Sequence, residues 1–301
     1  MKVLVLGSSG FLGSYLGFAL PRLGHEVSGV SRSPVPHFPG NHVVEGLEQF
    51  TDAFRSGDFD AVINCVAVAS HEVCEADPEN AQTVNAKFPA LWAAAVAETG
   101  ARFVHISTDA VFDGASTELY RETDATNPES VYGMTKVQGE RAVLAANPGA
   151  LVLRANFFGW SQHERSGILD FFVNAFSDQA PITGFQDYVV SSVYMGDLVD
   201  AMMELVEGGA SGVFHTVSSS PRSKYDFGQL VATATGLSAD SMTAGSLADA
   251  TGLAPRGHNL ALSTAKIEHV LGRVMPSTEA GIQRALSERD ALMDYFGGSE
   301  R

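Results

Sequence analysis

The chain has 301 residues, a formal net charge of −16 and two cysteines. This length suits one large domain or two closely packed ones, and the hydrophobic fraction of 45% is typical of a compact fold rather than a disordered chain. The acidity excludes a nucleic-acid-binding protein, and two cysteines provide no disulfide framework. Because no apolar run is long enough for a signal peptide or a membrane span, we expect a soluble, cytoplasmic protein without a membrane partner.

Short apolar runs in the first half of the chain predict buried strands of a parallel sheet. They are continuous and rich in β-branched residues, as in strands covered on both faces, and they occupy residues 3–6, 61–63, 103–106 and 151–153. Helical spacing of apolar residues in 12–23 and 81–95 predicts connecting helices. This alternation predicts a doubly wound α/β fold, with a Rossmann domain over residues 1–155.

The second half of the chain has a looser pattern. Helical stripes at 198–205 and 282–286 are separated by longer irregular stretches. We therefore expect residues 156–296 to form a smaller α/β lobe that binds the substrate and is partly interleaved with the first domain. The last residues, 297–301, are expected to be a disordered tail.

A glycine-rich segment lies between the first predicted strand and the first predicted helix. There, Gly7 permits a tight turn, Gly10 lets the backbone approach a pyrophosphate, and Gly13 lets helix and strand pack closely. The alternative is an ordinary glycine turn. We expect dinucleotide contacts from Gly7, Ser9, Gly10, Phe11, Leu12 and Gly13.

A further strand is predicted over residues 27–30, and the residues after it indicate which dinucleotide binds. An NAD site usually offers a carboxylate at this point, whereas Ser31 and Arg32 suit the 2′-phosphate of NADPH. We predict NADPH, with NADH as the alternative; Arg32 could also be an ordinary loop charge. The segment after the strand at 61–63 is expected to line the same site through Cys65, Val66 and Ala67.

Tyr132 and Lys136 are spaced to share one face of a helix. Pro128 is predicted to mark the start of this helix, which would place Tyr132 near the positive end of the helix dipole. The cation and the dipole together predict a lowered pKa for the phenol. Thr108 follows the strand at 103–106, where it can hydrogen-bond the same carbonyl oxygen that Tyr132 would protonate.

Pro89 cannot donate a hydrogen bond to the carbonyl of Asn85, four residues earlier. This arrangement predicts either an ordinary kink or a carbonyl that holds a water, through which Lys136 would replenish the tyrosine proton. His71 and Cys74 are too few to form a metal site, so no metal is predicted.

Two longer motifs carry a family resemblance: Ser-Thr-Asp-Ala-Val-Phe-Asp-Gly at 107–114 and Val-Tyr-Gly-Met-Thr-Lys-Val-Gln-Gly-Glu at 131–140. With the glycine segment and Asn85, they resemble the extended short-chain dehydrogenase/reductase superfamily, and within it the dTDP-4-dehydrorhamnose reductases. The resemblance implies NAD(P)H-dependent reduction of a ketone on a nucleotide-linked 4-keto-6-deoxysugar, with dTDP as the expected nucleotide.

The resemblance also implies roles for single residues. Tyr132 would act as the general acid, Thr108 would orient the ketone, Lys136 would bind the nicotinamide ribose, and Asp109 would contact the sugar. Phe157 stands where this family usually places a tryptophan against the sugar, which leaves the identity of the sugar open.

Other functions on the same scaffold stay open at this point. One is a non-catalytic, NADP-binding regulatory subunit, such as that of methionine adenosyltransferase; another is a nucleotide-sugar epimerase or dehydratase. A homodimer is compatible with each of these. Because both expected ligands are polyanions, we expect a neutral-to-positive cleft in this acidic protein, with basic residues drawn from Arg32, Lys136, Arg154, Arg222, Lys224 and Arg256.

Overall fold

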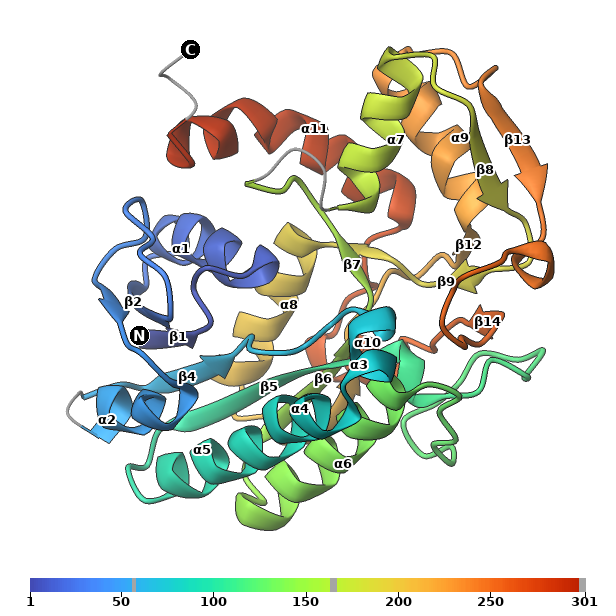
Figure 1. Cartoon of the computed structure of the whole chain (residues 1–301). Coiled ribbons are helices and arrows are strands. Elements are labelled where there is room, and N and C mark those ends of the chain that lie inside the picture. Colours follow the sequence, from blue (N-terminus) through green and yellow to red (C-terminus); the bar gives the residue numbers. More distant parts are fainter. Residues whose placement is uncertain (56–57, 163–166, 298–301) are drawn as a thin grey trace.

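The computed structural model describes residues 1–55, 58–162 and 167–297. Within these ranges a seven-stranded parallel sheet forms the centre of the molecule, in the order β11-β6-β5-β4-β1-β2-β3 (Figure 1). Its strands are β1 (Lys2–Leu6), β2 (Glu26–Ser31), β3 (Asn41–Val43), β4 (Ala61–Asn64), β5 (Arg102–Thr108), β6 (Leu151–Ala155) and β11 (Gly212–His215). The predicted doubly wound α/β fold is confirmed.

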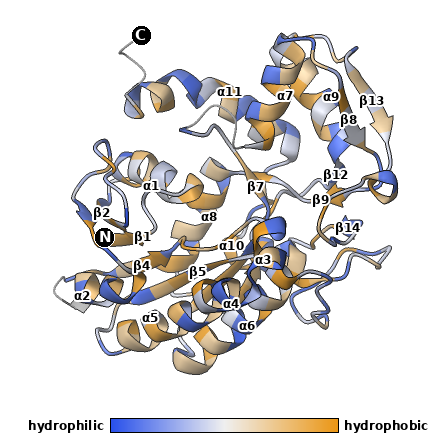
Figure 2. Cartoon of the chain, viewed as in Figure 1, coloured by the Kyte–Doolittle hydropathy of each residue, from blue (hydrophilic) through white to orange (hydrophobic). Residues whose placement is uncertain are grey.

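Successive residues of the inner strands pack into different cores on the two faces of the sheet. Val3 and Val5 face the core that contains α1 (Phe11–Arg22) and α8 (Met195–Glu207). Leu4 and Leu6 face the other core, with α2 (Phe50–Arg55) and α5 (Phe88–Ala97). Helix α6 (Val131–Ala146) packs beside α5 on that second face. Burial on both faces explains why these strands are continuous apolar runs, as Figure 2 shows.

The order of the strands reverses at β1, which pairs with β2 on one side and with β4 on the other. In an open parallel sheet, the carboxyl ends of the strands on either side of such a reversal diverge and leave a crevice for a ligand. The turn after β1, the segment after β4 and the end of β5 therefore share one edge of the sheet.

A second lobe lies at this edge (Figure 1). Its helices are α7 (Ile168–Ser177), α9 (Lys224–Thr235) and α11 (Thr278–Tyr295). Its short strands are β7 (Phe157–Phe158), β8 (Ile182–Phe185), β9 (Val189–Val190), β10 (Val193–Tyr194), β12 (Arg222–Ser223), β13 (Met242–Gly245) and β14 (Asn259–Leu260). Strand β11 and helix α8, also from the second half of the chain, complete the central layers instead. The central sheet therefore includes a strand from beyond residue 155, where we placed the end of the first domain. Of the tail expected at 297–301, residues 298–301 lie outside the described residues.

Two helix predictions differ from the structure. The helix expected over 81–95 is divided into α4 (Pro78–Gln82), a π-helical turn (Thr83–Lys87) and α5, so the chain absorbs Pro89 by widening one turn. Pro128 does not start the next helix. Helix α6 begins at Val131, because the Ser130 hydroxyl accepts a hydrogen bond from the backbone N–H of Gly133 at 3.1 Å and caps the helix.

Two short helices remain: α3 (His71–Ala76) packs against α4 and α6, and α10 (Ala265–Leu271) packs against α8 and β11. Among the helices of the described ranges, none has the length and apolar character needed to cross a membrane.

Candidate active site

The turn between β1 and α1 is shaped by the absence of side chains. Gly7 has a φ of +87°, in the left-handed region that favours glycine, and Gly10 caps the amino end of α1. A Cβ on Gly13 would lie 2.0 Å from the carbonyl oxygen of Gly7. The helix therefore starts directly against the strand, with exposed backbone at Ser9 and Gly10, as binding of a pyrophosphate requires. Phe11 is half-buried and Leu12 is buried, so Leu12 can offer a ligand only its backbone.

The segment after β4 closes one side of this turn. Val66 approaches Gly7 so closely that a Cβ there would lie 3.0 Å from its Cγ2. The backbone N–H of Cys65 donates to Leu6 O at 3.0 Å, while that of Val66 donates to the Asn64 side chain at 3.0 Å. Cys65 and Val66 are half-buried and Ala67 is exposed, at the position where the sequence predicts cofactor contacts.

Ser31 and Arg32 differ in what they can offer to a ligand. Ser31 is buried at the end of β2; its hydroxyl donates to Ser33 O at 2.6 Å and accepts from the Asn41 amide at 3.1 Å. The Ser31 hydroxyl would have to exchange its bond to Ser33 O in order to bind a phosphate, and its contact with the cofactor stays a prediction. Arg32 is exposed and is the residue of this pair that can reach an anionic ligand.

Tyr132, the second residue of α6, lies beside Thr108 at the carboxyl end of β5, close enough for the two hydroxyl groups to interact. The predicted lowering of the phenol pKa is wrong. Burial raises the pKa of Tyr132 well above its usual range, and the nearby charge of Asp109 raises it further. The Thr108 hydrogen bond acts in the opposite direction but does not outweigh burial.

Lys136 is directed at β5, where its Nζ donates to Ile106 O at 2.7 Å. The side chain is 1% exposed, and this burial lowers its pKa to about 8, although the nearby charge of Glu140 acts to raise it. The lysine is therefore still mostly protonated at neutral pH. Its carbonyl partner immediately precedes Ser107 and Thr108, which ties Lys136 to the strand that presents the Thr108 hydroxyl.

Asn85 joins the segment after β4 to α6. Its buried side chain donates to Val68 O at 3.1 Å and to Thr135 Oγ1 at 3.0 Å, and accepts from the Val68 N–H at 2.8 Å. Its backbone carbonyl lies in the π-helical turn and packs on Gly139, where a Cβ would be 2.2 Å from the oxygen. This carbonyl thus contacts a neighbouring helix rather than lining an open kink; the water relay stays a prediction.

Asp109 is buried beside the Thr108–Tyr132 pair. Its carboxylate accepts from Asn156 Nδ2 at 2.7 Å and from Thr108 Oγ1 at 3.1 Å. Burial raises the pKa of Asp109, although these hydrogen bonds favour the ionised form. Phe157 is half-buried and stacks on Phe11 with ring centres 5.9 Å apart, so its ring lies toward the glycine turn.

Three of the six basic residues expected in the cleft are paired with carboxylates. Arg256 pairs with Glu72, Arg154 with Glu140 and Arg222 with Glu279. Because these three charges are neutralised locally, a positive cleft would depend mainly on the other three candidates, Arg32, Lys136 and Lys224. Arg256 still lies close enough to influence the pKa values of His71 and Tyr188, which places it near the second lobe's side of the site.

Sequence reasoning missed His71 and Tyr188 as neighbours of Tyr132. The His71 ring lies 4.8 Å from the Tyr132 ring, and Tyr132 is close enough to Tyr188 to raise the pKa of that phenol. No local pattern could reveal these contacts, since the three residues come from α3, α6 and the segment before β9. Among the described residues, no group of three or more His, Cys, Asp or Glu side chains is placed to hold a metal ion.

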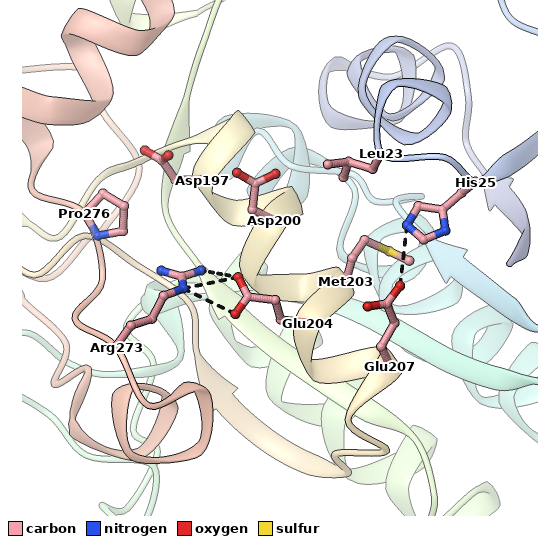
Figure 3. Close-up of a pocket in the computed structure, with 9 residues that line it drawn as sticks. All are labelled: Leu23, His25, Asp197, Asp200, Met203, Glu204, Glu207, Arg273 and Pro276. Carbon is pink, nitrogen blue, oxygen red and sulfur yellow. Dashed lines mark hydrogen bonds and ion pairs between the residues drawn. The ribbon is translucent and has the colours of Figure 1, made fainter.

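A separate groove lies between α1 and α8, on a different part of the molecule (Figure 3). Its acidic side chains are largely paired: Glu204 binds Arg273, and Glu207 lies 3.7 Å from His25. None of the residues discussed above lines it. We therefore place the candidate active site at the edge formed by β1, β4 and β5.

The sheet order, the glycine turn and the Thr108, Tyr132 and Lys136 side chains together define an extended short-chain dehydrogenase/reductase. Residues 1–291 match the family model of the RmlD substrate binding domain, and the chain belongs to that family of NAD(P)-dependent reductases.

The chain is 32% identical over 299 residues to the probable low-salt glycan biosynthesis reductase Agl14 of Haloferax volcanii, covering 96% of this chain and 99% of that protein. It is 33% identical over 231 residues to the dTDP-4-dehydrorhamnose reductase of Mycolicibacterium smegmatis, covering 75% and 66% of the two chains. The crystal structure of a dTDP-4-dehydrorhamnose reductase from Clostridium acetobutylicum superposes with a TM-score of 0.85 at 26% identity, covering 96% of this chain and all of that one.

Proposed function

We propose that this protein reduces the ketone of a nucleotide-linked 4-keto-6-deoxyhexose, with dTDP as the expected nucleotide and NADPH as the preferred hydride donor. The observation that carries the proposal is the meeting of Thr108 and Tyr132 at the carboxyl end of β5, on the edge that also bears the glycine turn. The similarity to dTDP-4-dehydrorhamnose reductases supports the choice of substrate class.

The raised pKa of Tyr132 suits a general acid. The phenol stays protonated at neutral pH and gives up its proton only when a stronger base forms beside it, as the ketone oxygen becomes when it gains negative charge. The Thr108 hydroxyl, which donates to Asp109 in the free protein, can rotate to donate to the same oxygen and hold it in place. NADPH, when bound, supplies the hydride.

The residues around the glycine turn fit a dinucleotide. Gly13 lets α1 start directly against β1, which leaves the exposed Ser9 and Gly10 at the amino end of the helix, where backbone N–H groups can hold a pyrophosphate. Lys136, charged at neutral pH, can bind the nicotinamide ribose near Tyr132. Exposed Arg32 after β2 supports a preference for the 2′-phosphate of NADPH over NADH.

The proposal is tested by mixing the purified protein with NADPH or NADH and a panel of nucleotide-linked 4-keto-6-deoxyhexoses, following the absorbance of the reduced cofactor. Tyr132→Phe should lower kcat by roughly 10²- to 10⁴-fold while leaving NADPH affinity nearly unchanged. The matched control is Tyr295→Phe, which removes a buried hydroxyl of α11 that has no hydrogen-bond partner in the described chain.

Failure would take one of two forms. A wild-type protein that oxidises no reduced cofactor with any sugar of the panel would refute the reductase proposal, and a change in the kinetics of an added partner enzyme would then favour the regulatory-subunit alternative. A Tyr132→Phe variant as active as the wild type would refute the role of Tyr132.

A further inference from the structure

Lys224 brings a positive charge from the second lobe toward the active site. It is the first residue of α9, and its backbone N–H donates to Tyr188 O at 3.1 Å. Its Nζ lies 5.4 Å from the centre of the Tyr188 ring, on a partly buried side chain. Tyr188 is in turn close enough to Tyr132 and Asp109 for their charges to affect its pKa. Lys224 therefore lies in the neighbourhood of Tyr132 and Asp109.

The position of Lys224 does not favour a cation. The amino end of a helix carries the positive end of its dipole, which repels an ammonium group. Burial lowers the pKa of Lys224 to about 8, and within the described chain its ammonium makes no hydrogen bond. The charge of Asp109 is what stabilises it. A lysine whose charged form is destabilised by its surroundings, and that lies near the candidate active site, is a candidate for ligand binding.

Lys266 provides a structural comparison. It also lies at the start of a helix, α10, and over an aromatic ring, with its Nζ 4.1 Å from the centre of Phe214. Its ammonium, however, donates to Val213 O at 2.6 Å. Of these two lysines, Lys224 is the one whose ammonium makes no hydrogen bond within the described chain, so all three of its donors are available to a ligand.

Asp109 and Lys224 lie near enough for their charges to interact, but they are not in direct contact. Neither Asp109 oxygen lies within 4.0 Å of the Lys224 ammonium, since no ion pair between them occurs in the described part of the chain, yet their charges attract. A group between them would accept from the ammonium and donate to the carboxylate. A hydroxyl does both, whereas a phosphate or carboxylate would be repelled by Asp109.

We propose that Lys224 and Asp109 together bind the sugar hydroxyl next to the ketone. The inference rests on the proposed function, because Thr108 links Asp109 to the position of the ketone oxygen through a 3.1 Å hydrogen bond. Lys224 is then a specificity-determining residue contributed by the second lobe, and it selects substrates with a hydroxyl adjacent to the carbonyl carbon.

The test combines two substrates with two lysine variants. The substrates are a dTDP-linked 4-keto-6-deoxyhexose and its 3-deoxy counterpart, which lacks the adjacent hydroxyl. Lys224→Met should lower kcat/KM by roughly 10- to 100-fold on the first and by less than about 3-fold on the second, because only the first loses a charged hydrogen bond. Lys224→Gln, which keeps a neutral donor, should fall between. Lys266→Met is the matched control and should leave both values unchanged.

Each other outcome overturns the inference. Equal losses on the two substrates would mean that Lys224 acts on the site as a whole, and weaker binding of dTDP alone to Lys224→Met would mean that it binds the diphosphate. Unchanged NADPH affinity and Tm show that the variants are folded. A wild-type protein that reduces neither substrate would refute the proposed function itself, whereas a wild type active on both, with Lys224→Met equally active, would refute only the role of Lys224.

Discussion

The turn between β1 and α1 and the region between β5 and α6 both contribute to the candidate site, but they do so in different ways. The first is made of backbone, and what matters there is the absence of Cβ atoms at Gly7, Gly10 and Gly13. The second is made of buried side chains whose pKa values are set by their neighbours, above all Tyr132 and Lys136. The first can be understood from a short motif, whereas the second depends on residues that lie far apart in the sequence.

The largest effect is expected for Glu140, whose buried side chain joins α6 to β5 and β6. Glu140 accepts from Ser107 at 2.5 Å and from two nitrogens of Arg154 at 2.8 and 3.0 Å, and the ion-paired side chains are each 5% exposed. Glu140→Gln leaves the Arg154 charge buried without a counter-charge, which should lower the free energy of unfolding by about 3–5 kcal/mol in urea titrations. Glu279→Gln, which breaks the half-exposed pair with Arg222, should cost less than about 1 kcal/mol. Equal costs would contradict this difference.

A smaller effect is expected in the backbone-built turn. Gly13→Ala places a Cβ 2.0 Å from the Gly7 oxygen, so helix and strand must separate slightly. We expect a loss of roughly 1–3 kcal/mol in unfolding experiments, together with weaker NADPH binding in fluorescence titrations. Gly149→Ala is the control, because the nearest atom to its Cβ is the end of the Asn147 side chain at 3.3 Å. Unchanged NADPH affinity in Gly13→Ala would show that the turn does not hold the cofactor.

The smallest expected effect is a pH dependence of NADPH affinity, which distinguishes titration of Lys136 from titration of Tyr132. The folded-state pKa of Lys136 is about 8, below its usual value, so its ammonium is present below pH 8 and is lost as the pH rises through 8. NADPH affinity should therefore fall by roughly 3- to 10-fold between pH 7 and 9.5. Cys65 beside it has its pKa raised to about 12 and does not titrate in this window. Because the pKa of Tyr132 is also raised, Tyr132→Phe should keep the same decline; its disappearance would assign the titration to the tyrosine.

Much of the fold could be predicted from the sequence because the inner strands are buried on both faces. The runs at 3–6, 61–63, 103–106 and 151–153 all lie in strands of the central sheet. Strand β11 was missed, since its four residues mix glycine, valine, phenylalanine and histidine at the sheet's edge. Pro89 predicts a disturbed helix near Asn85, but the sequence alone does not show that the chain accommodates it with a π-helical turn whose Asn85 carbonyl packs on Gly139.

The members of the site could be predicted better than their electrostatics. Tyr132 and Lys136 share a helix face, as their spacing indicates, but the spacing carries no information about burial, which raises one pKa and lowers the other. Pairing is equally non-local: Arg154 and Glu140 sit on a strand and a helix, and Arg256 meets Glu72 from the far end of the chain. Charges that look available in a sequence can therefore be neutralised in the fold.

The placement of β11 has a consequence for how this protein can change over time. Strand β11 pairs with β6, and α8 covers the face of the sheet beside α1, so both complete a layer that the first half of the chain begins. A gene fragment that ends at residue 155 would encode a sheet with a bare apolar edge, which invites aggregation. The second lobe is therefore not a module that recombination could exchange without β11 and α8. Any exchanged segment has to preserve the pairing of β11 with β6 and the packing of α8 against the sheet.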